Sequence, residues 1–358
     1  MKKKITFLGI ETSCDETAAA VIRENEKGTA DIMSNIVSSQ INEHKEFGGV
    51  VPELAARAHL ENIESIINKS LIDSKTSLAE IDGVAATAGP GLIVCLTVGL
   101  NIGKSIAAFS NKPFVGVNHL EGHALSPGLE NKIQFPYLLL LISGGHSQYL
   151  IVKDVNDYEQ LGTTIDDALG EAYDKTAKLL NLGYPGGPAL ENISKRGDKN
   201  YFKLPEPIIN KGGCNLSFAG LKTAVLRISK NIKDDEKMKY NLAASFQNTI
   251  NKILYKKTQI AVKMFKEKIK TEKIKLVVAG GVAANLSIRN NLSNLASEMN
   301  FEIIYPNLKF CGDNAAMIAW AGIKRFKKEL IDNLEIPAKS RWPLDKNAPY
   351  MKGPGLKL

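Results

Sequence analysis

The pattern of apolar runs and polar breaks predicts two β-hairpins, one in each half of the chain. Residues 5–22 read as an apolar strand, a small polar turn at 14–16 and a second strand, and residues 136–152 repeat this layout around a turn at 143–146. A strand, a tight turn and a returning strand are typical of a hairpin. The repetition predicts a duplicated, two-lobed α/β fold with a cleft between the lobes.

The remaining periodicity predicts helices and parallel-type strands. Helices are expected at 51–73, from 92 to about 110, at 166–181, and at about 235–269 and 313–328. Strands are expected at 83–87, 113–118 and 274–279. The predicted division is an N-terminal lobe at 1–135, a C-terminal lobe at 136–330 whose final helix can pack back across the cleft, and a proline-rich tail at 331–358 that is packed on the surface or partly disordered.

Length and composition indicate a folded, soluble protein. With 358 residues, 44% of them hydrophobic, the chain can bury a large core. Glu11 interrupts the apolar stretch after the basic start, which argues against a signal peptide, and no apolar run approaches the roughly 18 residues of a membrane span. The four cysteines are far apart, which argues against a zinc cluster or a disulfide framework and suits the cytoplasm.

The formal net charge of +8 leaves nucleic-acid binding open. Lysines concentrate between Lys252 and Lys275, but only seven of the 46 basic residues are arginine, and asparagine and isoleucine are plentiful. An AT-rich genome produces that pattern, and phosphate recognition often favours arginine. The charge alone therefore fits a nucleic-acid partner and a solvated lysine-rich face equally well.

A candidate metal site is formed by His119 and His123 together with Asp313. Histidines four residues apart point from one face of a helix, so that two imidazole nitrogens can converge on one ion, and a carboxylate is the usual third ligand. Such a site keeps open positions for substrate oxygens, and iron(II) or zinc suits the ligand set.

Glycines at four element boundaries favour a nucleotide ligand, because they let the backbone approach a phosphate or ribose near a helix N-terminus. These places are 88–91, 143–146, 184–188 and 279–282. None fits the P-loop or the dinucleotide-binding pattern.

Ten motifs, in order, carry a resemblance to a known family. They are Ile10–Thr17, Gly48–Glu53, Thr87–Gly91, His119–His123, Ser143–His146, Glu171–Thr176, Tyr184–Gly187, Phe218–Thr223, Gly280–Asn285 and Gly312–Asn314. In these motifs the chain resembles the TsaD family of tRNA threonylcarbamoyladenosine transferases, formerly labelled O-sialoglycoprotein endopeptidases, over about residues 5 to 345. The resemblance implies the actin-like, sugar-kinase-like (ASKHA) ATPase fold.

The resemblance also implies an activity. The threonylcarbamoyl group would pass from threonylcarbamoyl-AMP to the N6 amine of the adenosine just 3′ of the anticodon, in tRNAs that read codons beginning with A (t6A synthesis). One divalent metal ion is implied, with Fe²⁺ ahead of Zn²⁺. The implied partners are tRNA, a TsaB-like paralogue, a TsaE-like ATPase and a separate synthase that makes the adenylate, with no membrane.

Individual roles follow from the resemblance by position. The implied metal ligands are His119, His123 and Asp313, the residues lining the substrate are Leu141, Ile142, Ser143, Gly144 and Gly145, and those contacting its adenylate part are Asp174, Gly187 and Asn285. Asp174 could equally form a surface ion pair, and Asn285 could be only a helix N-cap. A solvated face is the favoured interpretation of Lys222 and of the basic helix after Lys252.

The catalytic hypothesis concerns the first hairpin turn. An adenine amine must lose a proton as it attacks, and Asp15 or Glu16 could accept that proton or orient the amine. The alternative is that both residues merely cap the turn.

Three other functions compete with this interpretation. A zincin-type metalloprotease needs glutamate directly after its first histidine, whereas Leu120 stands there, and Glu121 falls nearly on the opposite side of the helix from His119. An ASKHA-fold small-molecule kinase or ATPase would not require the histidine pair. A nucleotide-regulated scaffold would not require the metal for its function.

Overall fold

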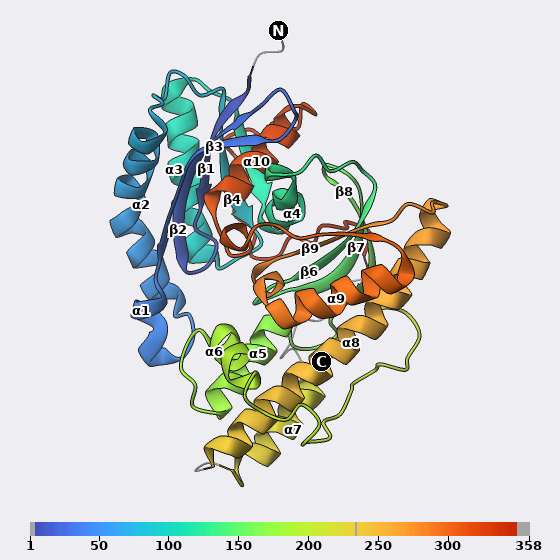
Figure 1. The fold of residues 1–358 in the computed structure, drawn as a ribbon. Coiled ribbons are helices and arrows are strands. Elements are labelled where there is room, and N and C mark those ends of the chain that lie inside the picture. The colour runs from blue at the N-terminus through green and yellow to red at the C-terminus, as the bar shows by residue number, and fades with distance from the viewer. Residues whose placement is uncertain (1–3, 233–234, 349–358) are drawn as a thin grey trace. The chain divides into compact units, whose positions relative to one another are not determined.

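The computed structural model describes residues 4–232 and 235–348, and the chain divides into two compact units (Figure 1). Unit 1 comprises residues up to 135, 154–158 and 306–346, and unit 2 is formed mainly by 136–153 and 159–305. The sequence-based division had placed 306–330 in the C-terminal lobe. These residues belong to unit 1 because the helix within them packs on the sheet of that unit.

Unit 1 contains a five-stranded mixed sheet in the order β3-β2-β1-β4-β5. The strands are β1 (Thr6–Glu11), β2 (Glu16–Glu24), β3 (Ala30–Ser39), β4 (Gly83–Gly89) and β5 (Phe114–Asn118). Strands β1 and β2 pair antiparallel, and β4 and β5 add in parallel beside β1. The first predicted hairpin is thus confirmed. Alternation along β1 sends Phe7 and Leu8 to opposite faces, so both faces of the sheet need cover.

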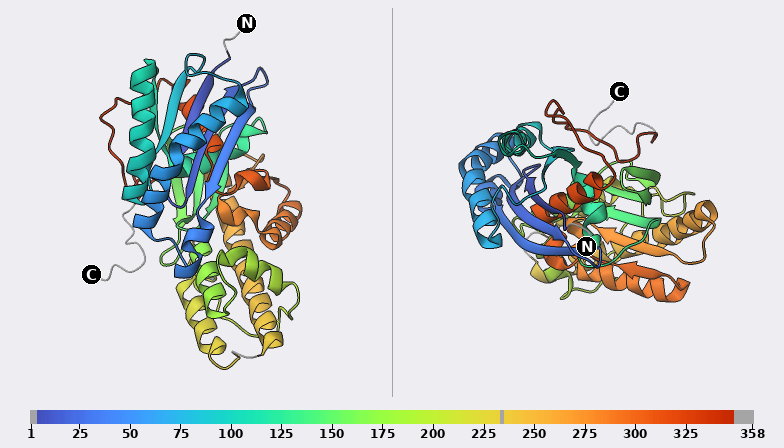
Figure 2. Two further views of the ribbon diagram at one scale, coloured as in Figure 1. Left: turned by 90° about the vertical axis from the view of Figure 1, so that its left-hand side faces the viewer. Right: turned by 90° about the horizontal axis from the view of Figure 1, so that it is seen from above.

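Helices cover both faces of this sheet (Figures 1 and 2). They are α2 (Pro52–Ser74), α3 (Ile93–Ser110), α4 (His119–Leu125) and α10 (Ala315–Phe326), whereas the one-turn helix α1 (Ile41–His44) lies in the connection from β3 to α2. Apolar residues of α2 and α3 join Leu8 in one core, while α10 joins Phe7 in the other. Gly9 permits the close approach of α10, because a Cβ there would lie 2.4 Å from the backbone oxygen of Ala315.

One helix among the described residues, α3, is long and apolar enough to cross a membrane by length and composition alone. The expectation that no apolar run approaches that length is therefore wrong for Ile93–Ser110. A single helix of this kind is weak evidence, since the core helix of a soluble protein passes the same test. In this chain α3 contacts β4 and α2.

Unit 2 contains a second five-stranded sheet in the order β10-β9-β6-β7-β8. Its strands are β6 (Tyr137–Ile142), β7 (Ser147–Asp154), β8 (Asp157–Thr163), β9 (Lys275–Ala279) and β10 (Glu302–Ile304). Strands β6 and β7 form the second predicted hairpin, and β9 and β10 add in parallel beside β6. Because strands β6 to β10 take the places that β1 to β5 take in unit 1, the predicted duplication is confirmed.

Five longer helices belong to unit 2. They are α5 (Leu169–Leu179), α6 (Gly186–Ser194), α7 (Ala219–Ser229), α8 (Glu236–Ile269) and α9 (Leu286–Met299). The helix predicted from residue 166 begins three residues later, because the Asp166 carboxylate instead accepts hydrogen bonds from the backbone of Phe218 and Ala219 at the start of α7. Of the glycine- and proline-rich stretch predicted at 184–188, Gly186, Gly187 and Pro188 form the first turn of α6, and Pro185 is its N-cap residue.

The proline-rich tail is ordered on unit 1 as far as it is described. Asp332 forms a β-bridge with Phe114, and the backbone N–H of Lys339 donates to the carbonyl oxygen of Ala88. Residues 349–358 of the predicted tail, with Pro349 and Pro354, lie outside the described residues. All four cysteines are free, as expected from their spacing.

Candidate metal centre and substrate site

The helix that carries the two histidines starts where β5 ends. The side chain of Asn118 caps α4 by accepting hydrogen bonds from the backbone of Leu120 and Glu121. His119 is the first residue of the helix and His123 lies one turn later, with ring centroids 4.8 Å apart and ring planes at 89°. Both rings are buried, so their nitrogens are directed by the protein and not by solvent.

Asp313 completes the cluster from the turn before α10. Its Oδ1 atom lies 3.0 Å from Nε2 of His123 and 3.4 Å from Nε2 of His119. Ligand atoms about 2.1 Å from one shared ion lie roughly 3.0–3.4 Å from each other in octahedral or tetrahedral geometry. The three side chains therefore fit a divalent cation. The sequence interpretation took Asp313 from the second lobe, whereas all three residues belong to unit 1.

Glu11 orients His119. Its Oε2 atom lies 3.1 Å from Nδ1 of His119, and the same carboxylate accepts hydrogen bonds from the Thr87 hydroxyl and from the backbone N–H of Ser13, both at 2.5 Å. A carboxylate that accepts the Nδ1 proton leaves Nε2 free for a metal, as is usual for metal-bound histidines. Sequence reasoning missed Glu11 and Thr87. The available signal was a glutamate at the end of an otherwise apolar central strand.

The electrostatics of the cluster favour positive charge. Burial raises the pKa of Glu11 and of Asp313, but the neighbouring imidazoles outweigh it, so both carboxyl pKa values lie below their usual ranges. Burial lowers the pKa of His119, yet Asp313 and Glu11 hold that pKa well above its usual range. Two ionised carboxylates around the imidazoles thus make a site that can exchange a proton for a metal cation.

Replacing Glu11 with glutamine should weaken metal binding about 10- to 100-fold, the usual cost of losing a partner behind a metal-bound histidine. The amide keeps the side-chain volume but loses the charge that holds the His119 ring. Competition titration of Zn²⁺ between a fluorescent chelator and the purified protein measures the affinity. Thr87→Val is the matched control, since it removes one hydrogen bond to Glu11 and leaves the carboxylate. Equal affinities for Glu11→Gln and wild type would exclude this role.

The two candidate catalytic acids lie in unit 1 with the metal cluster. Asp15 is buried in the hairpin turn, and Glu16 is the half-buried first residue of β2. Burial, then the charges of Asp313 and Asp15, raise the pKa of Glu16 well above its usual range. Asp313 is thus close enough to both the cluster and the turn to act on each electrostatically.

Glu121 cannot serve as the general base of a zincin. Its buried carboxylate accepts hydrogen bonds from Arg325 Nη1 at 2.8 Å, from the Tyr158 hydroxyl at 2.9 Å and from the backbone N–H of Asn156 at 2.8 Å. These partners occupy the carboxylate within unit 1. The geometry thus agrees with the sequence argument against a metalloprotease.

In unit 2 the turn between β6 and β7 presents open backbone. Ser143 closes the turn through its backbone N–H, which donates to the His146 carbonyl at 2.8 Å, and its carbonyl accepts from the N–H of Gly170 on α5. Gly144 and Gly145 face open space, with no atom within 4 Å of a Cβ built on either. Leu141 and Ile142 are fully buried at the end of β6. The open part of this segment is therefore Ser143 to Gly145, directly after them.

The three predicted adenylate residues lie on different elements of unit 2. Asp174 is not limited to a surface ion pair, since its carboxylate accepts from the N–H of Gly186 at 3.0 Å and ties α5 to the start of α6. Gly187 faces open space. Asn285 follows a 3₁₀ turn (Gly281–Ala284) and caps α9 by accepting from the Ile288 N–H, a role that is compatible with contacting a ligand.

Gln247 on α8 supports two of these elements, and sequence reasoning missed it. Its Oε1 atom accepts from the Asn285 amide at 3.0 Å and from the Tyr173 hydroxyl at 2.9 Å, and Tyr173 directly precedes Asp174. All of these polar groups except Asp174 are buried. A mid-helix glutamine offers no sequence signal for such a role.

The expectation that the lysines lie on a solvated face is wrong for two of them. Lys222 Nζ lies 2.6 Å from a carboxylate oxygen of Asp167, and its side chain is only 29% exposed. Lys257, on the basic helix, is fully buried and donates to the carbonyl oxygens of Lys211 and Gly213. The partners of both lysines lie in loops, and the sequence pattern does not show that these loops pack against α7 and α8. Lys252 and Lys256 are exposed, as expected.

Two sheets of identical strand order, each built on a hairpin, define an α/β protein of the actin-like, sugar-kinase-like class. Two solved structures agree with this fold. Full-length HypF aligns with a TM-score of 0.56 at 15% identity, covering 92% of this chain and 47% of HypF. Component A of (R)-2-hydroxyglutaryl-CoA dehydratase from Acidaminococcus fermentans aligns with a TM-score of 0.52 at 13% identity, covering 88% and 96%.

The family follows from sequence similarity. The TsaD family profile, described as tRNA N6-adenosine threonylcarbamoyltransferase, matches residues 31–320. A relative of that name from Pelagibacter ubique (strain HTCC1062) is 60% identical over 358 residues, all of both chains, and one from Sinorhizobium medicae (strain WSM419) is 50% identical over 98% of each. The chain belongs to the TsaD family. It is an acyltransferase that modifies tRNA, which confirms the resemblance carried by the motifs.

Proposed function

We propose that the chain transfers the threonylcarbamoyl group from threonylcarbamoyl-AMP to the N6 amine of the adenosine 3′-adjacent to the anticodon, in tRNAs that read codons beginning with A. Family membership supports acyl transfer to tRNA. The convergence of His119, His123 and Asp313 is the observation that supports the use of a metal ion in this reaction. The test is a transfer assay in which the purified protein is supplied with threonylcarbamoyl-AMP labelled in its threonine part. Incorporation of the label into such a tRNA is measured.

The proposed metal is a single divalent ion, Fe²⁺ in the first place and Zn²⁺ as the alternative. Held by two imidazoles and one carboxylate, it would supply a Lewis acid with open positions for substrate oxygens. The chain's own contribution is to fix the ligands: Glu11 sets the orientation of His119, and the Asn118 cap fixes the start of α4. Metal analysis of the purified protein identifies the ion.

The donor needs little chemical activation, because a mixed anhydride of a carbamate and AMP already has a reactive carbonyl. The protein must mainly position it and stabilise an oxyanion. We assign its binding to the end of β6 and the turn after it, Leu141, Ile142, Ser143, Gly144 and Gly145, and its adenylate part to Asp174, Gly187 and Asn285. The glycines facing open space and the helix starts at α5 and α6 support this assignment. A rise in KM for the adenylate in Gly187→Val would support it, and an unchanged KM would remove Gly187 from the site.

The transfer step forms a bond from the N6 nitrogen to the carbamate carbonyl carbon and breaks the bond from that carbon to the phosphate oxygen. AMP leaves with the bonding pair, and the amine proton passes to a base. We assign the base to Asp15, with Glu16 as the alternative. The burial of Asp15 in the turn near the metal cluster supports it.

Asp15→Ala should slow single-turnover transfer at least about 100-fold with donor bound, the lower end of the contribution of a positioned base. The rate is measured by rapid quench of labelled threonylcarbamoyl into tRNA. Bound metal and KM for the donor should stay near wild type. Near-normal transfer by Asp15→Ala would end the assignment, and Glu16→Gln would then be examined in the same assay.

The proposed partners besides tRNA are a TsaB-like paralogue and a TsaE-like ATPase, with cytoplasmic localisation. Candidate contact residues for a partner are the apolar side chains of Phe47, Leu60 and Ile72, on or beside α2, which are 55%, 63% and 72% exposed. Isothermal titration of the chain with the purified paralogue tests this, and no detectable heat or complex would refute it.

A further inference from the structure

A polar groove of about 790 Å³ lies in unit 2 along α8 and α9, two helices that contact each other. On α8 its wall is a stripe at helical spacing, formed by Asn248, Asn251, Lys252 and Tyr255. On α9 it is formed by Asn290, Asn291 and Asn294. Five asparagines on two facing helices make an unusually amide-rich lining for a cavity of this size, because ligand pockets are mostly apolar.

Some of these asparagine side chains hydrogen-bond to other residues of the lining, and two others are available to a ligand. Asn251 donates to the Ser287 hydroxyl at 2.9 Å and accepts from Gln247, while Asn291 donates to the Asn251 carbonyl at 2.9 Å. Asn290 and Asn294 lie one turn apart on the exposed side of α9. Neither of their side chains is hydrogen-bonded to another of the described residues. Each offers a donor and an acceptor of the kind that reads nucleotide base edges.

The charge along the rim is positive. Lys195 and Lys199 are exposed after α6, and the Lys252 side chain is 55% exposed with only a 3.4 Å approach to Glu206. Among the described residues of the lining the one acid is Glu191, whose Oε1 atom accepts from the backbone of Leu286 at 2.8 Å and so caps the start of α9. Three ammonium groups therefore face solvent at this groove without an opposing free carboxylate in its lining.

The groove is continuous with the elements assigned to the donor. Gln247 lines it and holds Asn285 through a 3.0 Å hydrogen bond, and Leu286 and Ser287 continue the chain directly from Asn285. We propose that this groove binds a single-stranded segment of the tRNA, with Lys195 and Lys199 on its phosphates and Asn290 and Asn294 on its bases. The inference rests on the proposed function, because it takes tRNA as the acceptor.

The lining favours RNA over the other candidate ligands. Single-stranded RNA is recognised by polar contacts to base edges, lysines along the backbone and aromatic rings, and Tyr255 supplies a ring within the groove. A protein partner would need buried apolar anchors, and the wall offers Leu286 alone as a large exposed aliphatic. A second small nucleotide would leave much of a stripe about two turns long without contacts.

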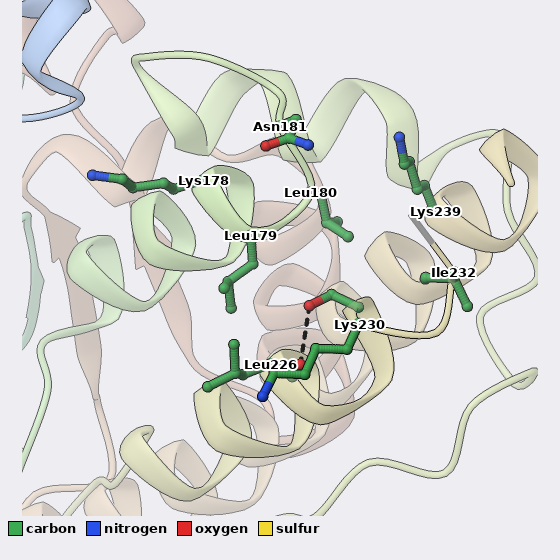
Figure 3. A pocket seen from close by; sticks show the side chains of 9 residues that line it. Lys178, Leu179, Leu180, Asn181, Leu226, Lys230, Ile232 and Lys239 are labelled. Atoms are coloured by element: carbon green, nitrogen blue, oxygen red, sulfur yellow. Dashed lines mark hydrogen bonds between the residues drawn. The ribbon is translucent and has the colours of Figure 1, made fainter. Parts of the chain in front are cut away.

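A second cavity in the same unit supplies matched controls. It measures about 350 Å³ and is lined by the ends of α5 and α7 with nearby residues (Figure 3). The side chains of Leu179 and Leu226 point toward one another there, and the amine of Lys178 points away from them. Lys178 and Lys230 thus carry the same charge as Lys195 and Lys199, at a smaller cavity whose lining holds one asparagine, Asn181, among the described residues.

The experiment measures binding of a fluorescein-labelled tRNA that reads a codon beginning with A, by anisotropy over a salt series, with the full-length protein. Each phosphate contact to a single strand adds about 0.7 to the slope of log K against log salt, which corresponds to roughly fivefold in affinity at 0.1 M. Lys195→Ala/Lys199→Ala should therefore bind about 25-fold more weakly with a slope lower by about 1.4. Asn290→Ala/Asn294→Ala should weaken binding with the slope unchanged.

The control pair Lys178→Ala/Lys230→Ala should bind as wild type does. Equal losses in both lysine pairs would show general electrostatic attraction and overturn the proposal, as would wild-type affinity in both groove variants. A raised KM for the adenylate with unchanged tRNA affinity would assign the groove to the donor and also overturn it. If wild-type protein transfers no threonylcarbamoyl group while the groove variants still lose tRNA binding, the proposed function fails and the groove assignment stands.

Discussion

Asp313→Ala should yield a protein that carries almost no metal and transfers the threonylcarbamoyl group at least about 100-fold more slowly, since even changes behind the ligands of such sites cost 10- to 100-fold. Asp313 Oδ1 lies between the Nε2 atoms of His119 and His123, at 3.4 and 3.0 Å, and supplies the only carboxylate of the trio. Two imidazoles alone give an incomplete ligand set. Elemental analysis of the purified variant and a tRNA transfer assay measure the two losses.

His119→Ala should reproduce both losses, because it removes a different ligand of the same ion. Asp154→Ala is the matched control: this aspartate also belongs to unit 1, but it forms a half-exposed pair with Lys328. Its metal content and transfer rate should be those of wild type. If Asp313→Ala lost its metal and still modified tRNA normally, a metal-independent or scaffolding role would replace the proposed one. Retention of one ion per chain would remove Asp313 from the ligand set.

Glu121→Ala should lower the free energy of unfolding by about 3–5 kcal/mol, the usual cost of leaving one member of a buried ion pair without its partner. Arg325 Nη1 lies 2.8 Å from the Glu121 carboxylate, and the two side chains are 8% and 1% exposed. The same carboxylate also binds Tyr158 and the backbone of Asn156, so its removal leaves several buried donors unsatisfied. Urea unfolding followed by circular dichroism measures the change.

An exposed pair provides the comparison for this stability effect. Lys69 and Asp73 on α2 lie 3.0 Å apart, with side chains 60% and 40% exposed, so Asp73→Ala should cost less than about 1 kcal/mol. Glu121→Leu/Arg325→Met should lose less stability than Glu121→Ala, because it removes both buried charges. A loss below about 1 kcal/mol for Glu121→Ala would show that the pair contributes little to the fold.

The elements predicted correctly from the sequence are those specified by local pattern. The two hairpins follow from apolar strands around short polar turns, Pro52 marks the first turn of α2, and Asp235 caps α8. The missed strands, β3, β8 and β10, lie at sheet edges. These three edge strands are partly exposed and mixed in polarity, so that they lack the continuous apolar run of a central strand such as β6. The buried edge strand β5 was predicted.

The sequence by itself determined the class of protein, through ten ordered motifs. It also indicated the candidate metal ligands, through the spacing of His119 and His123 and the resemblance that added Asp313. The tertiary structure decided which side chains support them. His123 and Asp313 are 190 residues apart and Glu121 and Arg325 are 204 apart, and Gln247 meets Asn285 from another helix. Periodicity and capping report only on neighbours within a few turns. Contacts over such separations depend on how helices such as α8 and α10 pack, which no local pattern encodes.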